Sequence, residues 1–299
     1  MSNLALIINS NSNMHINAPL HASQTPVCKP YRAIAKLRVR RSSAMHAIST
    51  IVTLACALPQ LASAAEEAVS VTPYRPSVST PAALSAPGWV EFEAGGQRIR
   101  AGDSSQRVSL PYTLKLAFTP DWGVRFGGEA WVRQTDDMGQ RISGAGDSSI
   151  VVKRRFAIDD ASAFGLEGGA TLPTGRKGIS ADKASYSVNG IYSADIGSLH
   201  TDVNLLGTRV GIADAGVSRL QWLWAASLSK ALNDDWGVVG ELSGTQQRGA
   251  DSSSQFLFAA SYNLSKSMTL DAGFSRSLKS GTPEWSVFSG VTLLLGRLF

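Results

Sequence analysis

Alternation of apolar and polar residues dominates the chain from Trp89 onward. In residues 108–118, large apolar side chains alternate with Ser, Thr, Lys and Ala, and residues 256–264 and 268–274 repeat the pattern. A period of two places successive side chains on opposite faces of a β-strand. No stretch after residue 64 has a convincing helical period, so the sequence predicts an all-β fold.

Residues 89–299 divide into about twelve such segments. Each segment with its connection takes roughly 18 residues, and a strand that crosses a bilayer needs about 9–11 of them. The connections alternate between tight turns and longer stretches rich in Gly, Ser and charge. The tight turns are 119–123, 159–162, 195–197, 233–237 and 265–266, and the longer stretches are 134–147, 173–184, 207–216, 245–254 and 278–284. This alternation predicts a transmembrane antiparallel up-and-down β-barrel over residues 89–299, with both termini on the periplasmic, short-turn side.

The two faces of the predicted strands differ in character. One face is apolar and suits lipid, whereas the other carries ionisable residues and suits a wet lumen. Leu223 and Leu257 are exceptions, because they fall on the polar side. The residues predicted to line the lumen are Arg125, Glu129, Lys153, Arg155, Glu167, Asp202, Glu241 and Asp271. Soluble sheets whose charged face meets solvent remain an alternative.

The final strand carries its own signal. Trp285, Val287, Val291 and Leu293 share an apolar face, and the strand ends at Phe299. It resembles the C-terminal strand of bacterial outer-membrane barrels, which the barrel assembly machinery reads. The resemblance implies that Phe299 is an assembly signal, although Arg297 stands where an apolar residue is usual. The alternative is an ordinary amphipathic edge strand.

Residues 1–64 have the pattern of a leader with a signal peptide. A basic stretch at Arg38–Arg41 precedes the mostly apolar 44–58 and a small-residue cleavage site at 62–64. Residues 1–37 exceed the ordinary length of a signal, and a true start near Arg38 would account for them; a transit peptide is the alternative. The leader holds six basic and no acidic residues, which leaves 22 basic against 23 acidic residues in 65–299. The basic balance therefore gives no argument for nucleic-acid binding.

Residues 65–88 contain Pro73, Pro76, Pro81 and Pro87 among Ser, Thr and Ala. This composition predicts a flexible or extended periplasmic lead-in to the barrel.

Two short motifs carry a family resemblance. Gly146-Asp147-Ser148 stands before the strand 151–156, and Leu172-Pro173-Thr174-Gly175 follows the next one. Together they resemble outer-membrane proteins of the MetA-pathway of phenol degradation type, a family of transporters, over most of residues 87–299. The resemblance implies a barrel linked to uptake of aromatic compounds, and it implies no catalytic residues.

A search for catalytic or metal-binding chemistry finds little. His200 is the only histidine after the leader, and no serine has a setting that distinguishes it as a nucleophile. Cys28 and Cys56 both lie in the leader, and no His/Cys/Asp cluster has metal-ligand spacing. We therefore expect no enzyme, no cofactor and no metal site.

Two functions follow from these observations. The first is a channel or transporter in the outer membrane of a Gram-negative bacterium, for small solutes that include aromatic or hydrophobic ones. The second is a barrel that transports nothing and acts as a structural or adhesive surface protein. The expected partners are outer-membrane lipid, the assembly machinery and an unknown solute; a plugged lumen is compatible with either function.

Overall fold

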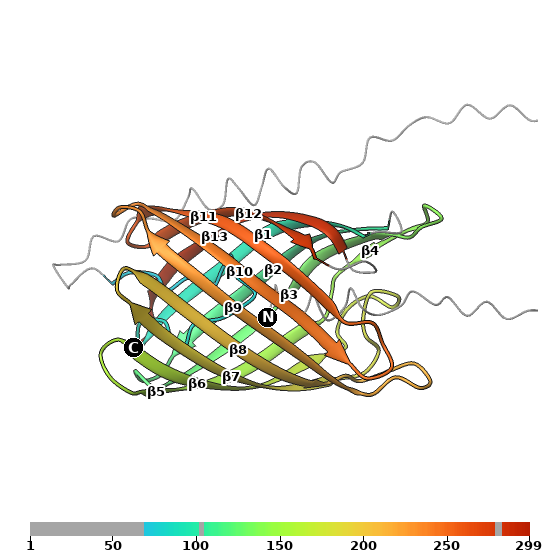
Figure 1. Ribbon diagram of the computed structural model, residues 1–299, viewed down its shortest axis with the longest axis horizontal. Helices are drawn as coiled ribbons and strands as arrows, with labels where there is room; N and C mark the ends of the chain where they lie inside the picture. The colour runs from blue at the N-terminus through green and yellow to red at the C-terminus, as the bar shows by residue number, and fades with distance from the viewer. Residues whose placement is uncertain (1–68, 102–104, 279–282) are drawn as a thin grey trace, which may run out of the picture. The chain divides into compact units, whose positions relative to one another are not determined.

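The computed structural model describes residues 69–101, 105–278 and 283–299. Within them it contains thirteen strands (Figure 1): β1 (Trp89–Ala101), β2 (Gln106–Ala117), β3 (Trp122–Thr135), β4 (Arg141–Gly144), β5 (Ser148–Ala157), β6 (Ser162–Leu172), β7 (Ser185–Ile196), β8 (Leu199–Arg209), β9 (Leu220–Ala231), β10 (Trp236–Gln247), β11 (Ser253–Ser265), β12 (Met268–Ser277) and β13 (Pro283–Arg297). The expected leader, residues 1–64, lies outside the described residues. No helix in the described ranges is long and apolar enough to cross a membrane.

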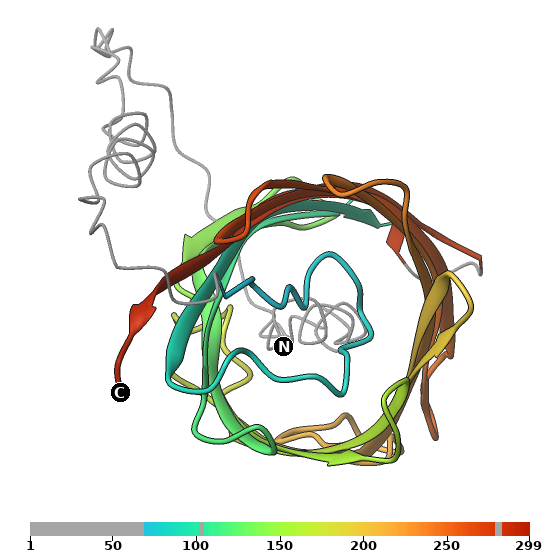
Figure 2. The ribbon, with the colours of Figure 1, turned by 90° about the vertical axis from the view of Figure 1, so that its left-hand side faces the viewer.

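Twelve of the strands form a closed antiparallel barrel. Each pairs with its neighbour in the chain, and β1 closes the ring by pairing with β13. The ring is plain when it is viewed along its axis (Figure 2). The short β4 stands outside this order, because it pairs only with the end of β3 and extends one long connection. The predicted all-β barrel is therefore confirmed.

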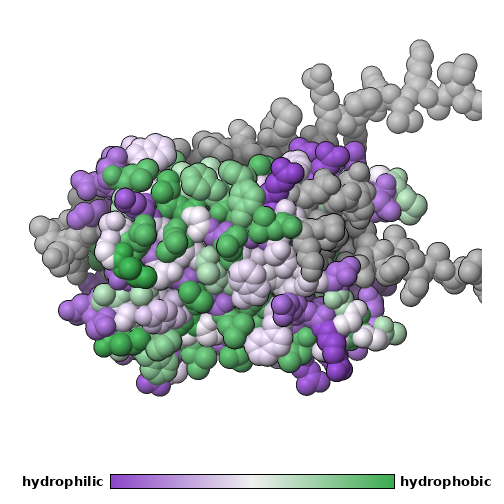
Figure 3. All heavy atoms as spheres, viewed as in Figure 1, coloured by the Kyte–Doolittle hydropathy of each residue, from purple (hydrophilic) through white to green (hydrophobic). Residues whose placement is uncertain are grey.

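The barrel turns its apolar side chains outward. Along β11, for example, Phe258 is 47% exposed, whereas Leu257 and Ala259 are buried inside the ring. Hydrophobic side chains gather over the strands, and hydrophilic ones gather toward the ends (Figure 3). An apolar belt around a closed barrel is the arrangement that lipid requires, because closure leaves no unpaired strand edge.

Two tight turns repeat the same construction. The amide of Trp122 donates to Thr119 Oγ1 at 3.0 Å, and the amide of Trp236 donates to Asn233 Oδ1 at 2.8 Å. In each turn the side-chain oxygen replaces a backbone acceptor, which is the reason that Thr and Asn suit the first position. Both Trp side chains begin a strand at the short-turn end and are exposed, as residues of an aromatic girdle are.

The last strand ends earlier than the sequence pattern predicts. β13 ends at Arg297, and the amide of Leu298 donates to the carbonyl of Gly88 at 2.7 Å. A register shift lies between the pairs Val90–Gly296 and Glu91–Leu294. This bulge reverses the alternation, so Arg297 falls on the face opposite that of Leu293. The apolar pattern therefore breaks at Arg297 for a structural reason.

Residues 69–88 belong to the stretch 65–88 that composition predicts to be a flexible or extended periplasmic lead-in. They run inside the ring of strands (Figure 2, cyan) and make ordered contacts with the barrel wall. Proline prevents these residues from joining a sheet, but it does not prevent them from binding to side chains.

Candidate functional site: a lumen occupied by the N-terminal segment

The N-terminal segment, defined here as residues 69–88, is tied to the barrel backbone at both ends. The amide of Val71 donates to the carbonyl of Lys266 at 2.9 Å, and the amide of Gly88 donates to the carbonyl of Ala117 at 2.8 Å. Lys266 and Ala117 both lie at the short-turn end. The segment therefore enters and leaves the lumen through the same mouth.

Between these ends, backbone amides of the segment donate to side chains of the wall. The distances are 2.7 Å for Tyr74 to Glu93, 3.1 Å for Val78 to Glu241, 2.8 Å for Ser79 to Glu241, 3.0 Å for Thr80 to Asn204, and 2.7 Å for Ala82 to Ser193. The acceptors lie on β1, β10, β8 and β7 in that order. The segment thus follows the inner wall. Polar lumen side chains accept its backbone hydrogen bonds, as the carbonyls of a neighbouring strand do in a sheet.

An ion pair anchors the segment to β12. Arg75 Nε lies 3.0 Å from Asp271 Oδ2, and Arg75 Nη2 lies 3.0 Å from Asp271 Oδ1. The guanidinium lies against Gly95 and Gly290, which face each other on β1 and β13. A Cβ at Gly95 would lie 2.8 Å from the guanidinium carbon, so side chains at this pair would displace Arg75.

Tyr74, which precedes Arg75, is the centre of a charged cluster on β1, β2, β3, β5 and β6. Its ring centroid lies 4.2 Å from Lys115 Nζ, 4.3 Å from Lys153 Nζ and 5.1 Å from the guanidinium of Arg125. Its hydroxyl donates to the carbonyl of Ala83 at 2.6 Å, and burial raises the pKa of Tyr74 well above its ordinary value. The phenol therefore stays neutral and presents its ring face to three cations.

The same three cations are paired with carboxylates. Lys115 lies 2.8 Å from Glu91 and 2.7 Å from Glu93, while Glu167 lies 2.8 Å from Arg125 and 3.2 Å from Lys153. Three cations and three anions balance within this cluster. Such pairing lets charged side chains remain buried inside a barrel.

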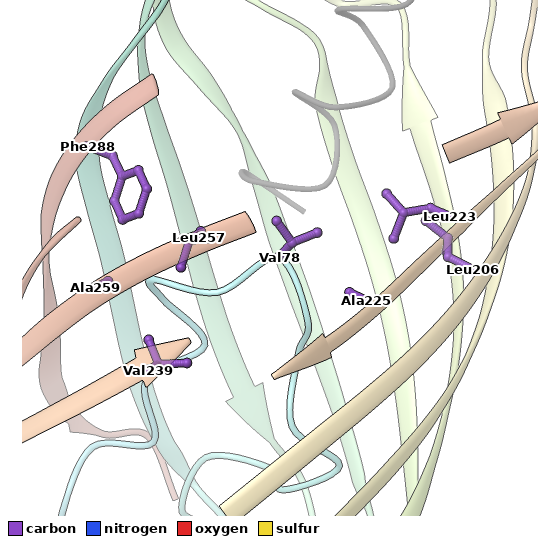
Figure 4. Close-up of a cluster of buried hydrophobic side chains, with 8 residues drawn as sticks. All are labelled: Val78, Leu206, Leu223, Ala225, Val239, Leu257, Ala259 and Phe288. Atoms are coloured by element: carbon purple, nitrogen blue, oxygen red, sulfur yellow. The ribbon is translucent and has the colours of Figure 1, made fainter. Parts of the chain in front are cut away.

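An apolar patch covers the wall opposite the charged cluster. Val78 of the segment belongs to this buried cluster, whose other members are Leu206, Leu223, Ala225, Val239, Leu257, Ala259 and Phe288 (Figure 4). Leu223 and Leu257, the exceptions to the sequence pattern, both belong to this patch. The interior is therefore not uniformly wet: the charged cluster lies on β1–β6, and the apolar patch lies mainly on β8–β11, where it adjoins the buried carboxylates Asp202 and Glu241.

The structure places the eight residues predicted to line the lumen as follows. Seven are buried: Arg125, Glu129, Lys153, Glu167, Asp202, Glu241 and Asp271. Of these, Glu241 and Asp271 bind the segment directly, and Lys153 contacts its Tyr74 and Pro81. Glu129 pairs with Arg107 at 2.5 Å, away from the segment. Arg155 is only half-buried and lies near the short-turn end of β5.

Several residues of the site are not among these eight. Glu91, Glu93 and Lys115 have the parity of the lumen face, so alternation places them on the same polar side. Arg75 and Tyr74 could not be found in that way, because they belong to a stretch with no strand period. Only the three-dimensional path of the segment brings them to the wall.

His200 does not form a catalytic triad. Its Nδ1 lies 2.6 Å from Asp195 Oδ1 and its Nε2 lies 3.2 Å from Asp202 Oδ1, and the nearby Ser193 hydroxyl donates to that same Asp202 oxygen. In a triad the serine must instead bond to the histidine. Among the described residues, no group of three or more His, Cys, Asp or Glu side chains could hold a metal ion.

Comparisons with solved structures show the same fold. The chain is similar to an outer membrane channel from Pseudomonas putida F1, with 12% sequence identity, a TM-score of 0.58, and coverage of 71% of this chain and 97% of that one. It is also similar to the NanC porin, with 11% identity, a TM-score of 0.50, and coverage of 69% and 100%. No curated protein matches the sequence. The family described as MetA-pathway of phenol degradation matches residues 140–295, which is just over half of the chain, so this protein belongs to that family.

Proposed function

We propose that this protein is an outer-membrane channel for small solutes, aromatic or hydrophobic ones among them. The observation that carries the proposal is the two-sided lumen, in which the charged cluster around Tyr74 faces an apolar patch around Val78. A barrel that served only as a scaffold would need no such division. The family's link to phenol degradation supports the same kind of solute.

The N-terminal segment sets the width of the bore in this proposal. Barrels of eight strands are filled by side chains, and those of sixteen or more enclose an aqueous channel, so a twelve-stranded barrel lies between them. A chain segment inside it narrows the passage further. We therefore expect a low conductance that rises when the segment is removed.

Ion selectivity should be weak in the intact protein. The charges of the Tyr74 cluster balance, and charges lining a bore tune selectivity through their net field. Neutralising Lys115 and Lys153 together would leave a net negative wall and favour cations. Neutralising Arg98 and Arg154, which are exposed on the outside of the barrel, is the matched control and should leave selectivity unchanged.

Conductance in planar bilayers tests the proposal directly. The comparison is between the intact protein and a variant that lacks residues 69–84 but keeps Gly88 and the start of β1. We expect small currents from the first and larger ones from the second. If both proteins insert but neither conducts, the channel function is wrong.

A barrel that transports nothing is the second candidate, and the occupied lumen is the observation that favours it. The same recordings decide between the two. Silence before and after removal of the segment would support the structural role.

We also propose that the protein is located in the outer membrane, with lipid around the barrel. The apolar belt supports our proposal that outer-membrane lipid surrounds the barrel, and residues 1–64 have the pattern of an export signal. Recovery of the protein with the outer-membrane fraction, and a gel mobility that changes on heating, are the expected results. Recovery as a soluble periplasmic protein would contradict them. A non-enzymatic role agrees with the arrangement at His200.

A further inference from the structure

Glu241 differs from the other buried carboxylates of the lumen. Glu91, Glu93, Glu129, Glu167 and Asp271 each pair with a Lys or Arg, and Asp202 lies 3.2 Å from His200 Nε2. Glu241 is 4% exposed, and within the described part of the chain it forms no ion pair. Its hydrogen bonds come from the N-terminal segment: Oε1 accepts from the amide of Val78 at 3.1 Å, and Oε2 accepts from the amide and hydroxyl of Ser79 at 2.8 and 2.7 Å.

The surroundings of Glu241 are polar toward β9, where Ser227 lies opposite it, and apolar toward β11. It lies directly opposite Leu257 in the sheet, and Val239 precedes it on the same face of β10. Gly273 on β12 leaves room for the Phe288 ring, because a Cβ there would lie 2.7 Å from a ring carbon. An isolated carboxylate in such a setting needs hydrogen-bond donors, since an unsatisfied buried charge is costly.

We propose that Glu241 and the apolar patch form a solute subsite, which the Val78–Ser79 pair occupies in this structure. The pair shows what the subsite accepts: a compact apolar group beside hydrogen-bond donors. The ligand class is a small apolar molecule that carries a hydroxyl or amine, such as an aromatic alcohol. Carboxylated analogues are excluded, because their anion would meet Glu241 without a cation between them.

This proposal rests on the channel function. It adds that a solute competes with Val78 and Ser79 of the N-terminal segment for the subsite. The segment leaves the strand ladder at Gly88, so residues before that point can move without breaking the barrel. A solute that fills the patch and donates to Glu241 replaces what Val78 and Ser79 provide. Binding then releases the segment and widens the bore for that class of solute.

A thiol placed in the segment reports its release. Cys28 and Cys56 are replaced by Ser in the full-length chain, and Ala82, which is fully buried, is replaced by Cys. Ser85→Cys, also buried, is a second and more conservative reporter. The rate of reaction with a charged maleimide is measured in detergent with benzyl alcohol, toluene, glycerol or benzoate at equal concentrations.

We expect benzyl alcohol to raise the rate several-fold and to saturate, with much smaller effects from toluene, glycerol and benzoate. Glu241→Gln should abolish the dependence on benzyl alcohol. Asp271→Asn weakens the ion pair with Arg75 of the segment but leaves the apolar patch intact. In this variant the labelling rate should still depend on benzyl alcohol. An equal effect of toluene, or a benzyl alcohol effect that survives Glu241→Gln, would overturn the subsite. Because labelling needs no current, this outcome is independent of whether the barrel conducts.

Discussion

Arg75 and Asp271 lie 196 residues apart in the chain and meet inside the barrel in a two-point ion pair. Arg75 belongs to a proline-rich stretch, and Asp271 belongs to the second-to-last strand. Planar guanidinium and carboxylate groups matched at two points fix orientation as well as position. The pair therefore holds the N-terminal segment in one place against the wall.

Removal of Arg75 should loosen the segment without unfolding the barrel. Loss of one partner from a buried pair costs about 3–5 kcal/mol, which is an upper bound here because water in the lumen can hydrate Asp271. Arg75→Ala should therefore speed amide hydrogen exchange at Val78–Ala82 and leave exchange in β9–β12 slow. Arg98→Ala, on the outer side of β1, is the control and should change neither. Unaltered protection of the segment in Arg75→Ala would show that Arg75 is not an anchor.

The ring of Tyr74 should hold the N-terminal segment in the lumen more strongly than its hydroxyl does. Tyr74→Phe loses two hydrogen bonds, the one to the Ala83 carbonyl, worth about 1 kcal/mol, and the one from Lys153, worth about 1.5–3 kcal/mol, but it keeps the ring face toward Lys115 and Lys153. Tyr74→Leu loses the desolvated cation–π contacts as well, each worth about 2 kcal/mol. Limited proteolysis of the folded protein should therefore cut the segment faster in the order wild type, Phe, Leu. If the Phe variant were cut as fast as the Leu variant, the hydroxyl would be the dominant contact.

The barrel itself could be predicted from sequence because period two survives over many strands. Residues such as Phe258 and Lys153 differ in environment through parity alone, and parity is local information. The alternation of turn and loop lengths adds the order of the strands. Even the repeated tight turns at Trp122 and Trp236 are visible as a repeated motif.

The contents of the lumen could not be predicted in the same way. The N-terminal segment has no period, and its composition is the same as that of a solvated linker. Its position depends on contacts with five or more strands that are distant in sequence, such as those of Arg75 with Asp271 and of Val78 with Glu241. Leu223 and Leu257 are the one local sign that something fills the lumen, because apolar side chains on the polar face need an apolar partner inside the barrel. The sequence does not say which residue is that partner.

The two faces of β11 should tolerate charge very differently. Lys in place of Phe258 would face hydrocarbon, at a cost of about 2–4 kcal/mol near the midplane. Lys in place of Ser261 would face the lumen directly opposite Asp271, beside its pair with Arg75, so the ammonium would meet an anion and not hydrocarbon. Urea titration of the proteins refolded into lipid vesicles should show a large loss of stability for Phe258→Lys and little change for Ser261→Lys. Equal losses would contradict the assignment of inside and outside.

Phe299 should matter for assembly in the cell and not for the stability of the finished barrel. It follows the last paired residue of β13, and 60% of its surface is exposed, so it contributes little packing. Deletion of Phe299 should leave refolding into detergent and the heat-modified gel shift unchanged. The same deletion should sharply reduce the amount of folded protein in outer membranes, because the assembly machinery is expected to read the terminal aromatic residue. Leu298→Ser removes a neighbouring exposed apolar side chain and is the control, which should assemble normally. Normal assembly of the deletion variant would exclude Phe299 as the signal, and a failure to refold in detergent would instead assign it a structural role.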